Sequence, residues 1–395
     1  MREHRNLQWL FPFMALGLLL LPGMVVPSSA QTFTVLHVFT GAEGFGPEAG
    51  LVQDGSGNLY GTTEAGGADW GGVVFEVDAS GIETVLHSFT GYSGTGDGAT
   101  PDDTLVRDNA GNLYGTTSYG GLNRCYGSCG VVFKIDSAGT ETILHSFAGG
   151  PTDGCNPWGG LIRDDAGNLY GTTSFCGSSG WGTVWKLDKN GKETILHNFQ
   201  GTDGGYPNSG NLLMDKEGNL YGVTQRGGGS ANEGVVYKLT KRGRLTVLHR
   251  FTGHGTPDGC FPIGTLAIDA QGSLYGATGA CGGYGYGIVW KLDKNRRETI
   301  LHTFLWSASD GAYPFGGVVL DSQGNLYGTT GRGGPGDGGG IVYKLSRDGT
   351  MTLLHTFSFT DGYYPHGELV RDANGGLYGT CALGGDNGGT VWSLK

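Results

Sequence analysis

Four short stretches rich in β-branched and aromatic residues follow one another, and this set of four recurs along the whole chain. In the first copy the stretches are residues 34–39, 50–53, 58–63 and 72–77, each bounded by Gly, Asp or Pro. Such runs predict β-strands, and no stretch with the periodicity of an amphipathic helix competes with them after residue 30.

A Tyr-Gly step in the third stretch marks the period of the repeat. It recurs at spacings of 51 to 56 residues, at Tyr60, Tyr114, Tyr170, Tyr221, Tyr275, Tyr327 and Tyr378. A period of this size is typical of a propeller or a solenoid, and a unit of about 50 residues matches one four-stranded blade. Seven units of four runs predict 28 strands.

The two ends of the chain favour a closed ring. The chain opens its first unit with the Leu-His run and ends with the fourth run of the last unit, residues 390–394. Pairing the N-terminal strand into the last blade would complete seven equal blades, whereas an open solenoid would need atypical capping units. We therefore predict an all-β, seven-bladed β-propeller over residues 31–395.

Two kinds of connection separate the ends of the predicted ring. One end has tight Asp-x-x-Gly turns, for which a turn role is favoured over calcium binding. Their acids are Asp54, Asp108, Asp164, Asp215, Asp269, Asp321 and Asp372. The other end has longer loops with an acid-Gly-x-x-Pro signature, which starts at Glu43, Asp97, Asp153, Asp203, Asp258, Asp310 and Asp361. A binding face is expected on the second, more varied end.

The repeated unit reads Gly-Asn-Leu-Tyr-Gly-Thr-Thr, a Gly-rich loop, Val-Phe-Lys-Leu and Leu-His-x-Phe. In these motifs the chain resembles the secreted GloVer tandem-repeat proteins, named for Gloeobacter and Verrucomicrobia. The resemblance covers nearly all of residues 31–395 and implies a secreted or surface-exposed protein.

Residues 1–30 have the features of a secretory signal peptide: basic residues, an apolar run over residues 9–21, and Ser28-Ser29-Ala30 before a cleavage point. Without them the chain has a net charge of −12. That charge disfavours nucleic acid and anionic membranes as partners. We expect a secreted protein, extracellular or periplasmic, monomeric and without membrane insertion after cleavage.

One histidine per unit follows Leu in the rim strand, at His37, His87, His145, His197, His249, His302 and His355. These positions face seven separate blade interfaces, so they cannot converge on one metal ion. A structural role is predicted for them, packed between blades with a hydrogen-bonded neighbour.

The cysteine spacing predicts two disulfides in the varied loops. Cys155 and Cys176 lie 21 residues apart, as do Cys260 and Cys281, and units that lack one partner also lack the other. Such bonds fit an oxidising compartment. Cys125 and Cys129 could close a further small loop, since a zinc site at this spacing lacks nearby partners, and Cys381 is left over.

Function is expected where the units differ, because a residue type shared by all seven units serves the blade. The residue after each loop Pro differs from unit to unit: Glu48, Asp102, Trp158, Asn208, Ile263, Phe315 and His366. Glu368 and Asp103 join the acidic sector, and an opposite sector carries the aromatic residues Trp158, Tyr206, Phe261, Tyr313, Phe315 and Tyr364. The predicted ligand-binding residues are Glu48, Asp102, Trp158, Asn208, Phe315, His366 and Glu368.

An acidic sector that faces aromatic residues suits a sugar, a cationic peptide or a divalent ion. The leading hypothesis is a non-catalytic propeller that binds a glycan or protein and needs no cofactor. One alternative is a carbohydrate- or lactone-active enzyme with Glu48, Asp102 or Glu368 as acid, base or metal ligand. Another is a purely structural envelope component. No nucleophile, phosphate-loop, dinucleotide or metalloprotease motif is present in the sequence.

Overall fold

The computed structural model describes residues 31–91, 96–122, 129–207, 210–336 and 338–395. The predicted signal peptide, Asn208 and Cys125 lie outside the described residues. Thr32–Lys395 form one compact unit, and the rest of the fold concerns this unit alone.

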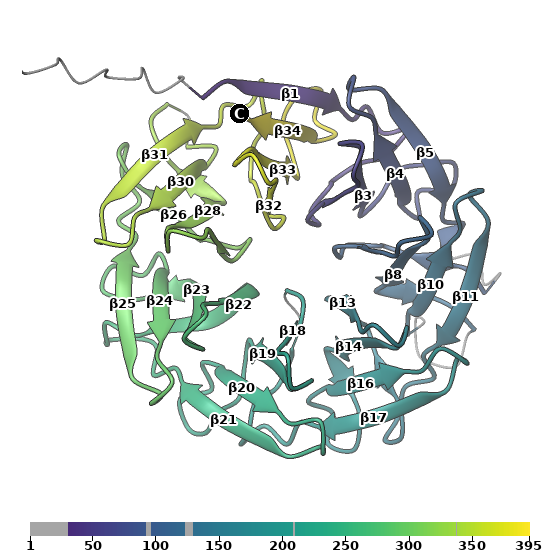
Figure 1. Cartoon of the computed structure of the whole chain (residues 1–395), viewed down its shortest axis with the longest axis horizontal. Helices are drawn as coiled ribbons and strands as arrows, with labels where there is room; N and C mark the ends of the chain where they lie inside the picture. The colour runs from purple at the N-terminus through teal and green to yellow at the C-terminus, as the bar shows by residue number, and fades with distance from the viewer. Residues whose placement is uncertain (1–30, 92–95, 123–128, 208–209, 337) are drawn as a thin grey trace, which may run out of the picture. The chain divides into compact units, whose positions relative to one another are not determined.

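The unit is a seven-bladed β-propeller with four strands in each blade, which confirms the predicted fold class (Figure 1). In the first blade the strand order is β2-β3-β4-β5, from the channel to the rim. The inner strands are β2 (Val52–Gln53), β7 (Val106–Arg107), β13 (Gly159–Arg163), β18 (Leu213–Met214), β22 (Gly259–Ile268), β27 (Val319–Leu320) and β32 (Val370–Arg371).

The second strands carry the Tyr-Gly step. They are β3 (Leu59–Thr63), β8 (Leu113–Thr117), β14 (Leu169–Thr173), β19 (Leu220–Thr224), β23 (Leu274–Cys281), β28 (Leu326–Thr330) and β33 (Leu377–Cys381). The third strands are β4 (Val73–Val77), β10 (Val131–Ile135), β16 (Thr183–Leu187), β20 (Val235–Leu239), β24 (Ile288–Leu292), β30 (Ile341–Leu345) and β34 (Thr390–Leu394).

The rim strands carry the Leu-His pair. They are β5 (Glu83–Ser88), β11 (Glu141–Ser146), β17 (Glu193–Asn198), β21 (Leu245–Arg250), β25 (Glu298–Thr303), β31 (Met351–Thr356) and β1 (Phe33–Val38). β1 pairs antiparallel with β34, so the last blade reads β32-β33-β34-β1. The first and last strands of the unit therefore share one sheet.

Six further strands lie outside the blades, in the described part of the varied loops, and form three two-stranded sheets. The pairs are β6 (Gly98–Ala99) with β9 (Tyr119–Gly120), β12 (Gly154–Cys155) with β15 (Phe175–Cys176), and β26 (Gly311–Ala312) with β29 (Arg332–Gly333). The loop entering an inner strand thus pairs with the loop that leaves the second strand of the same blade. This pairing orders the end of the ring where binding is expected.

A glycine packed under an aromatic ring explains why Tyr-Gly and Val-aromatic steps occur together. Gly61 pairs with Phe75 across β3 and β4, and a Cβ atom at Gly61 would lie 2.6 Å from the ring of Phe75 and 2.9 Å from Leu51. Phe75 is fully buried. In each of the other blades the equivalent glycine lies against the corresponding aromatic ring: Phe133, Trp185, Tyr237, Trp290, Tyr343 and Trp392.

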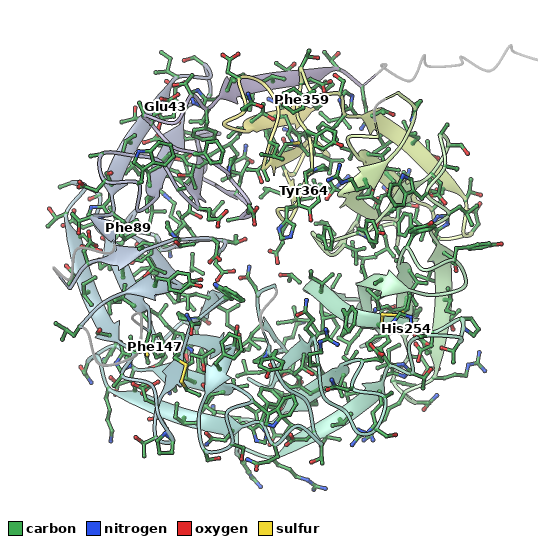
Figure 2. The ribbon with its side chains drawn as sticks, turned by 180° about the vertical axis from the view of Figure 1, so that it is seen from behind. Glu43, Phe89, Phe147, His254, Phe359 and Tyr364 are labelled. Atoms are coloured by element: carbon green, nitrogen blue, oxygen red, sulfur yellow. A yellow bond between two sulfur atoms is a disulfide. The ribbon has the colours of Figure 1, made fainter. Side chains whose placement is uncertain are left out.

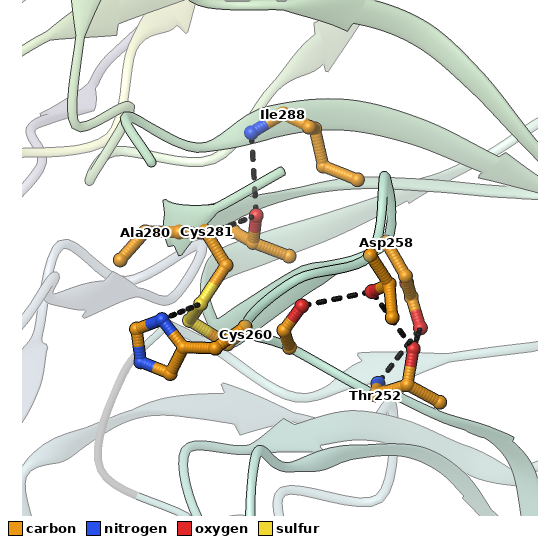
Figure 3. Close-up of a disulfide and its surroundings, with 10 residues drawn as sticks. Thr252, Asp258, Cys260, Ala280, Cys281 and Ile288 are labelled. Atoms are coloured by element: carbon orange, nitrogen blue, oxygen red, sulfur yellow. Dashed lines mark hydrogen bonds between the residues drawn. A yellow bond between two sulfur atoms is a disulfide. The ribbon is translucent and has the colours of Figure 1, made fainter. Parts of the chain in front are cut away.

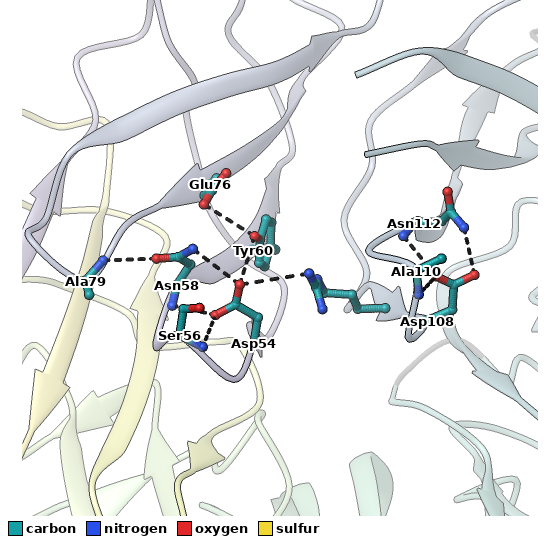
Figure 4. Close-up of polar contacts among 10 residues, drawn as sticks. Asp54, Ser56, Asn58, Tyr60, Glu76, Ala79, Asp108, Ala110 and Asn112 are labelled. Carbon is teal, nitrogen blue, oxygen red and sulfur yellow. Dashed lines mark hydrogen bonds and ion pairs between the residues drawn. The ribbon is translucent and has the colours of Figure 1, made fainter. Parts of the chain in front are cut away.

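The Asp-x-x-Gly turns at the other end have the predicted structural role (Figure 4). The carboxylate of Asp54 accepts hydrogen bonds from the backbone N–H groups of Ser56 at 2.8 Å and Asn58 at 3.0 Å. The hydroxyl of Tyr60 lies 3.3 Å from the same carboxylate, which links the turn to the Tyr-Gly strand. Gly57 has a φ of 92°, a conformation that favours glycine.

Candidate functional site at the channel mouth

Backbone contacts between blades place the residues at the mouth of the channel. The residue before each loop Pro has a left-handed φ of 52 to 67°: Gly46, Thr100, Asn156, Tyr206, Phe261, Tyr313 and Tyr364. Thr100 N donates to Gly71 O of the preceding blade at 2.8 Å, and Thr100 O accepts from Ser118 N at 3.0 Å. Six of the seven are not glycine, and this conformation costs such residues about 1–3 kcal/mol each.

This geometry turns the residues after the Pro toward one cavity of about 330 Å³. Its lining includes six of the seven residues predicted to bind a ligand: Glu48, Asp102, Trp158, Phe315, His366 and Glu368. Asn208, the seventh, lies outside the described residues. Residues far apart in the sequence are therefore neighbours here, although their binding role stays a prediction.

Carboxyl groups form one wall of the cavity: Glu48, Glu64, Asp102 and Asp103. Burial raises the pKa of Asp102 to about 7, against a 2.9 Å hydrogen bond from the Ser118 hydroxyl and with a further rise from Glu48 and Glu64. Burial also raises the pKa of Asp103 well above its ordinary value, and Asp102 and Glu368 add to this rise. Crowded carboxyl groups in this wall thus hold protons near neutral pH.

His366 lies beside this wall, with its Nδ1 4.0 Å from the Glu48 carboxylate. Burial lowers the pKa of His366, so the neutral imidazole is favoured. Its ring stacks with Tyr364 at an angle of 18° and contacts Phe315 at 5.1 Å between centroids. Figure 2 shows Tyr364 toward the centre of the ring, whereas Glu43 lies near its rim.

The facing wall is less aromatic than the sequence indicates. Trp158, Phe315 and Ile263 line the cavity. Tyr206, Phe261, Tyr313 and Tyr364 are not among its lining residues, because they occupy the position before Pro and contact neighbouring loops instead. The indole Nε1 of Trp158 is buried and has no hydrogen-bond acceptor among the described residues.

Glu368 forms a floor that joins blades across the channel. Its carboxylate accepts a hydrogen bond from Asn211 Nδ2 at 3.2 Å, in the fourth blade, and one from the hydroxyl of Thr265, in the fifth. Burial raises the pKa of Glu368 in spite of these hydrogen bonds. Glycine occupies the equivalent position in blades one, three and six, as Gly50, Gly160 and Gly317, where a Cβ would collide with neighbouring atoms.

Sequence reasoning missed Glu64 as a wall residue and Thr104, Asn211 and Thr265 as partners around the floor. A signal for Glu64 existed, since the residue after the second strand is acidic in the first unit alone. The floor residues share the position before the buried aliphatic residue of the inner strand, and this position also varies between units.

Both predicted disulfides are present, Cys155–Cys176 and Cys260–Cys281. Each joins the two varied loops of one blade, and Figure 3 shows the second. His254 Nδ1 lies 3.8 Å from Cys281 Sγ. Cys381 is a free and fully buried thiol, and burial raises its pKa. The Cys125–Cys129 pair is not described because Cys125 lies outside the described residues.

The rim histidines pack between blades as predicted, each in edge contact with the buried Phe two residues later, as His87 is with Phe89 at 4.7 Å between ring centroids. The expected hydrogen-bonded neighbour is the acid of the acid-Gly-x-x-Pro loop in four cases: His197–Asp203, His249–Asp258, His302–Asp310 and His355–Asp361. No such bond is formed by His37, His87 or His145 to the described residues.

Solved structures with the same fold come from several bacteria. The extracellular domain of a protein assigned as a hybrid two-component system of B. thetaiotaomicron superposes with a TM-score of 0.55 at 13% identity, over 92% of this chain and 41% of that one. PorZ, a surface component of the type-IX secretion system of Porphyromonas gingivalis, superposes with a TM-score of 0.53 at 15% identity, over 87% of this chain and 46% of that one.

A protein assigned as a 6-phosphogluconolactonase, from Bacteroides uniformis, gives a TM-score of 0.50 at 15% identity, over 78% of this chain and 84% of that one. The chain spans about two fifths of the length of the first of these structures. At such identities the likenesses show the fold alone.

Among curated proteins no match was found. No helix in the described ranges is long and apolar enough to cross a membrane. The family model of the Gloeobacter/Verrucomicrobia repeat matches residues 23–174 and 157–392, which together span nearly the whole chain. The chain therefore belongs to the Gloeobacter/Verrucomicrobia repeat family.

Proposed function

We propose that the protein is a secreted, non-catalytic propeller that binds a carbohydrate in the cavity at the channel mouth. One observation carries this proposal: carboxyl groups of Glu48, Glu64 and Asp102 line the same cavity as the ring systems of Trp158 and Phe315. Carboxyl groups accept and donate hydrogen bonds to hydroxyl groups, and aromatic rings pack against the C–H face of a sugar ring.

The size and polarity of the cavity support a small polar ligand. Its volume of about 330 Å³ falls at the lower end of the range that small-molecule sites occupy, about 300–1,000 Å³. The unpaired indole N–H of Trp158 would gain an acceptor from a ligand hydroxyl, which would remove the cost of a buried donor without a partner. The two disulfides fit an oxidising, extracellular or periplasmic compartment.

A glycan array followed by calorimetry on the selected sugars would test the proposal. Trp158→Ala and Phe315→Ala should each weaken binding by about tenfold or more, because each removes an aromatic wall of the cavity. Trp70→Ala is the matched control, since Trp70 is 63% exposed on a varied loop and lies outside the cavity lining. Equal losses in all three variants, or no saturable ligand, would contradict the proposal and favour a purely structural role.

Acid-base catalysis on a sugar or lactone is the second candidate, and the near-neutral pKa of Asp102 favours it. A carboxyl group that titrates near pH 7 can give or take a proton under working conditions, and Glu48 or Glu368 could act with it. Turnover of chromogenic glycosides or of aldonolactones, abolished by Asp102→Asn, would establish the enzyme. Binding without turnover would leave the first proposal in place.

A divalent cation at the acidic wall is a variant of either candidate. Its presence would show as an ion that is lost in Glu48→Gln or Asp102→Asn. If EDTA treatment of the purified protein leaves sugar binding and thermal stability unchanged, the cavity works without a metal.

A further inference from the structure

The seven blade interfaces at the rim share a histidine and an acid but differ in a third residue. The histidine comes from a rim strand, the acid from the loop that follows it, and the third residue from the start of the next rim strand. That residue is Glu83, Glu141, Glu193 and Glu298 at four interfaces, and Leu245, Met351 and Phe33 at the other three. The molecule thus holds two versions of one interface.

Where the third residue is apolar, the histidine contacts its acid directly. The distance from the imidazole Nε2 to the carboxylate is 2.9 Å for His197–Asp203, 3.1 Å for His302–Asp310 and 3.1 Å for His355–Asp361. All three are ordinary hydrogen bonds. These interfaces need nothing further to satisfy the imidazole.

Where the third residue is glutamate, the histidine stands back from the acid and lies between two carboxylates. His87 Nε2 is 3.7 Å from Asp97 and 3.8 Å from Glu141. The second set repeats this arrangement, with His145 Nε2 3.6 Å from both Asp153 and Glu193. In the third set, His249 Nε2 lies 3.4 Å from Asp258 and 3.8 Å from Glu298.

Apart from the His249–Asp258 hydrogen bond, these spacings are too long for hydrogen bonds, and they are slightly longer than the edges of a metal coordination shell. Ligand atoms about 2.0–2.1 Å from a tetrahedral ion lie about 3.3 Å from one another. In each of the three sets one atom of each side chain lies within 4.8 Å of the others. The fourth interface, with His37, Glu43 and Glu83, has a longer acid and a His37–Glu43 distance of 3.9 Å, and it does not form such a set.

In two of the three sets, buried polar atoms without partners are a second observation that points to a ligand, whereas His249 has a 3.4 Å hydrogen bond to Asp258. His87 Nε2 and Glu141 Oε1 have no hydrogen-bond partner among the described residues, and neither do His145 Nε2 and Glu193 Oε1. An unpaired buried polar atom costs about 1–3 kcal/mol, more where the group is charged. The glutamate oxygen nearest the imidazole is Oε2 in both sets, so one shared cation would satisfy the imidazole Nε2 directly and Oε1 through bidentate binding of the carboxylate.

Backbone N–H groups also hold the acids in place, as hydrogen bonds from surrounding groups do for the carboxylates that bind metals. Asp97 accepts hydrogen bonds from Thr90 N at 2.8 Å and Gly98 N at 2.7 Å. Asp153 accepts equivalent bonds from Ala148 N and Gly154 N, both at 2.7 Å. Backbone amides therefore fix the carboxylates while leaving lone pairs for a cation.

We propose that the three sets His87–Asp97–Glu141, His145–Asp153–Glu193 and His249–Asp258–Glu298 each bind a divalent transition-metal ion that joins neighbouring blades. One imidazole and two carboxylates are ligands that suit Zn²⁺ or Mn²⁺, whereas Ca²⁺ prefers oxygen alone. The ions would stabilise the ring at its rim, far from the carbohydrate cavity and independently of it.

Metal content measured by plasma mass spectrometry, after removal of metals with EDTA and reloading with Zn²⁺ or Mn²⁺, tests the proposal. About three ions per chain are expected, one for each set. Glu141→Gln, Glu193→Gln and Glu298→Gln should each remove one ion, with folding checked by circular dichroism. His197→Gln is the matched control and should remove none, because that interface has Leu245 in place of the glutamate.

A gain of binding gives a second, independent readout. Leu245→Glu places the missing carboxylate next to His197 and Asp203 and should add one ion. Co²⁺ loading should give visible absorption bands that weaken in each of the three Glu→Gln variants and persist in Glu217→Gln, which changes an exposed glutamate outside both the rim sets and the cavity lining. No bound ion after loading, or a metal content that the Glu→Gln variants leave unchanged, would overturn the proposal.

Discussion

Two regions of the molecule differ in how they use the repeat: the frame, meaning the blade strands and turns that recur in all seven units, and the mouth of the channel. In the frame, the glycine of the Tyr-Gly step contacts an aromatic ring in all seven blades. At the mouth, the residue after the loop Pro is different in every blade described, with Glu48, Asp102, Trp158 and Phe315 among those lining the cavity. A residue type that recurs in every blade serves folding, and a position where the blades differ can serve a ligand.

The strongest way to break the frame is Gly61→Val. Its side chain would enter space already filled by Phe75 and Leu51, since a Cβ alone would lie 2.6 Å from the Phe75 ring. Overpacking at a buried strand position costs up to about 3 kcal/mol, and more where the surroundings cannot move. Urea denaturation should show this loss of stability.

Gly55→Val is the matched control for this substitution. Gly55 is exposed, and a Cβ there meets no atom within 4 Å. The free energy of unfolding of the Gly55→Val variant should stay within about 0.5 kcal/mol of the wild-type value. If Gly61→Val were as stable as Gly55→Val, the packing role assigned to the Tyr-Gly step would be wrong.

The two disulfides among the described residues stand between the two regions, because each joins varied loops within one blade. The paired change Cys260→Ser and Cys281→Ser should cost about 3 kcal/mol of stability, as expected for a loop of about 20 residues. A lower midpoint in urea would confirm this. An unchanged midpoint would show that the β22–β23 pairing alone holds these loops, since these strands already pair at Cys260 and Cys281.

The sequence is sufficient for the frame because each of its contacts repeats. Seven copies of Tyr-Gly, Asp-x-x-Gly and Leu-His predict the blades and their order, and the varied loops predict the end of the ring where the cavity lies. The sequence is not sufficient where contacts join different blades. Glu368 meets Asn211 and Thr265 only because the ring brings three blades together, and no spacing along the chain shows this.

The rim acids illustrate the same limit. Each unit has one histidine and one acid-Gly-x-x-Pro loop, so a pairing within the interface was open to prediction. The third residue comes from the following unit, and its alternation between glutamate and an apolar residue gains meaning only when the distances at the seven interfaces are compared.

Glu368→Gln tests whether a residue at the channel mouth also stabilises the fold. The expected change in stability is smaller than for Gly61→Val or for loss of the disulfide. Burial raises the pKa of Glu368, Asp102 and Asp103 in the folded protein. A group whose pKa is raised on folding adds to the stability of the folded state, and this contribution is fully present below the pKa of the unfolded chain, near 4. It is lost as the pH rises through the pKa in the folded protein, which is about 7 for Asp102. Wild-type stability should therefore fall from pH 5 to pH 8.

Gln keeps the size of Glu368 and can still accept a hydrogen bond from Asn211 while its amide donates to the Thr265 hydroxyl. It also removes one of the charges that raise the pKa of Asp103. The variant should thus lose less stability than the wild type between pH 5 and pH 8, by a difference on the order of 1 kcal/mol. Thermal melts across this range, with exposed Glu217→Gln as control, would measure the difference. A variant that is less stable than wild type at every pH would instead show that the charged carboxylate itself holds the blades together across the channel.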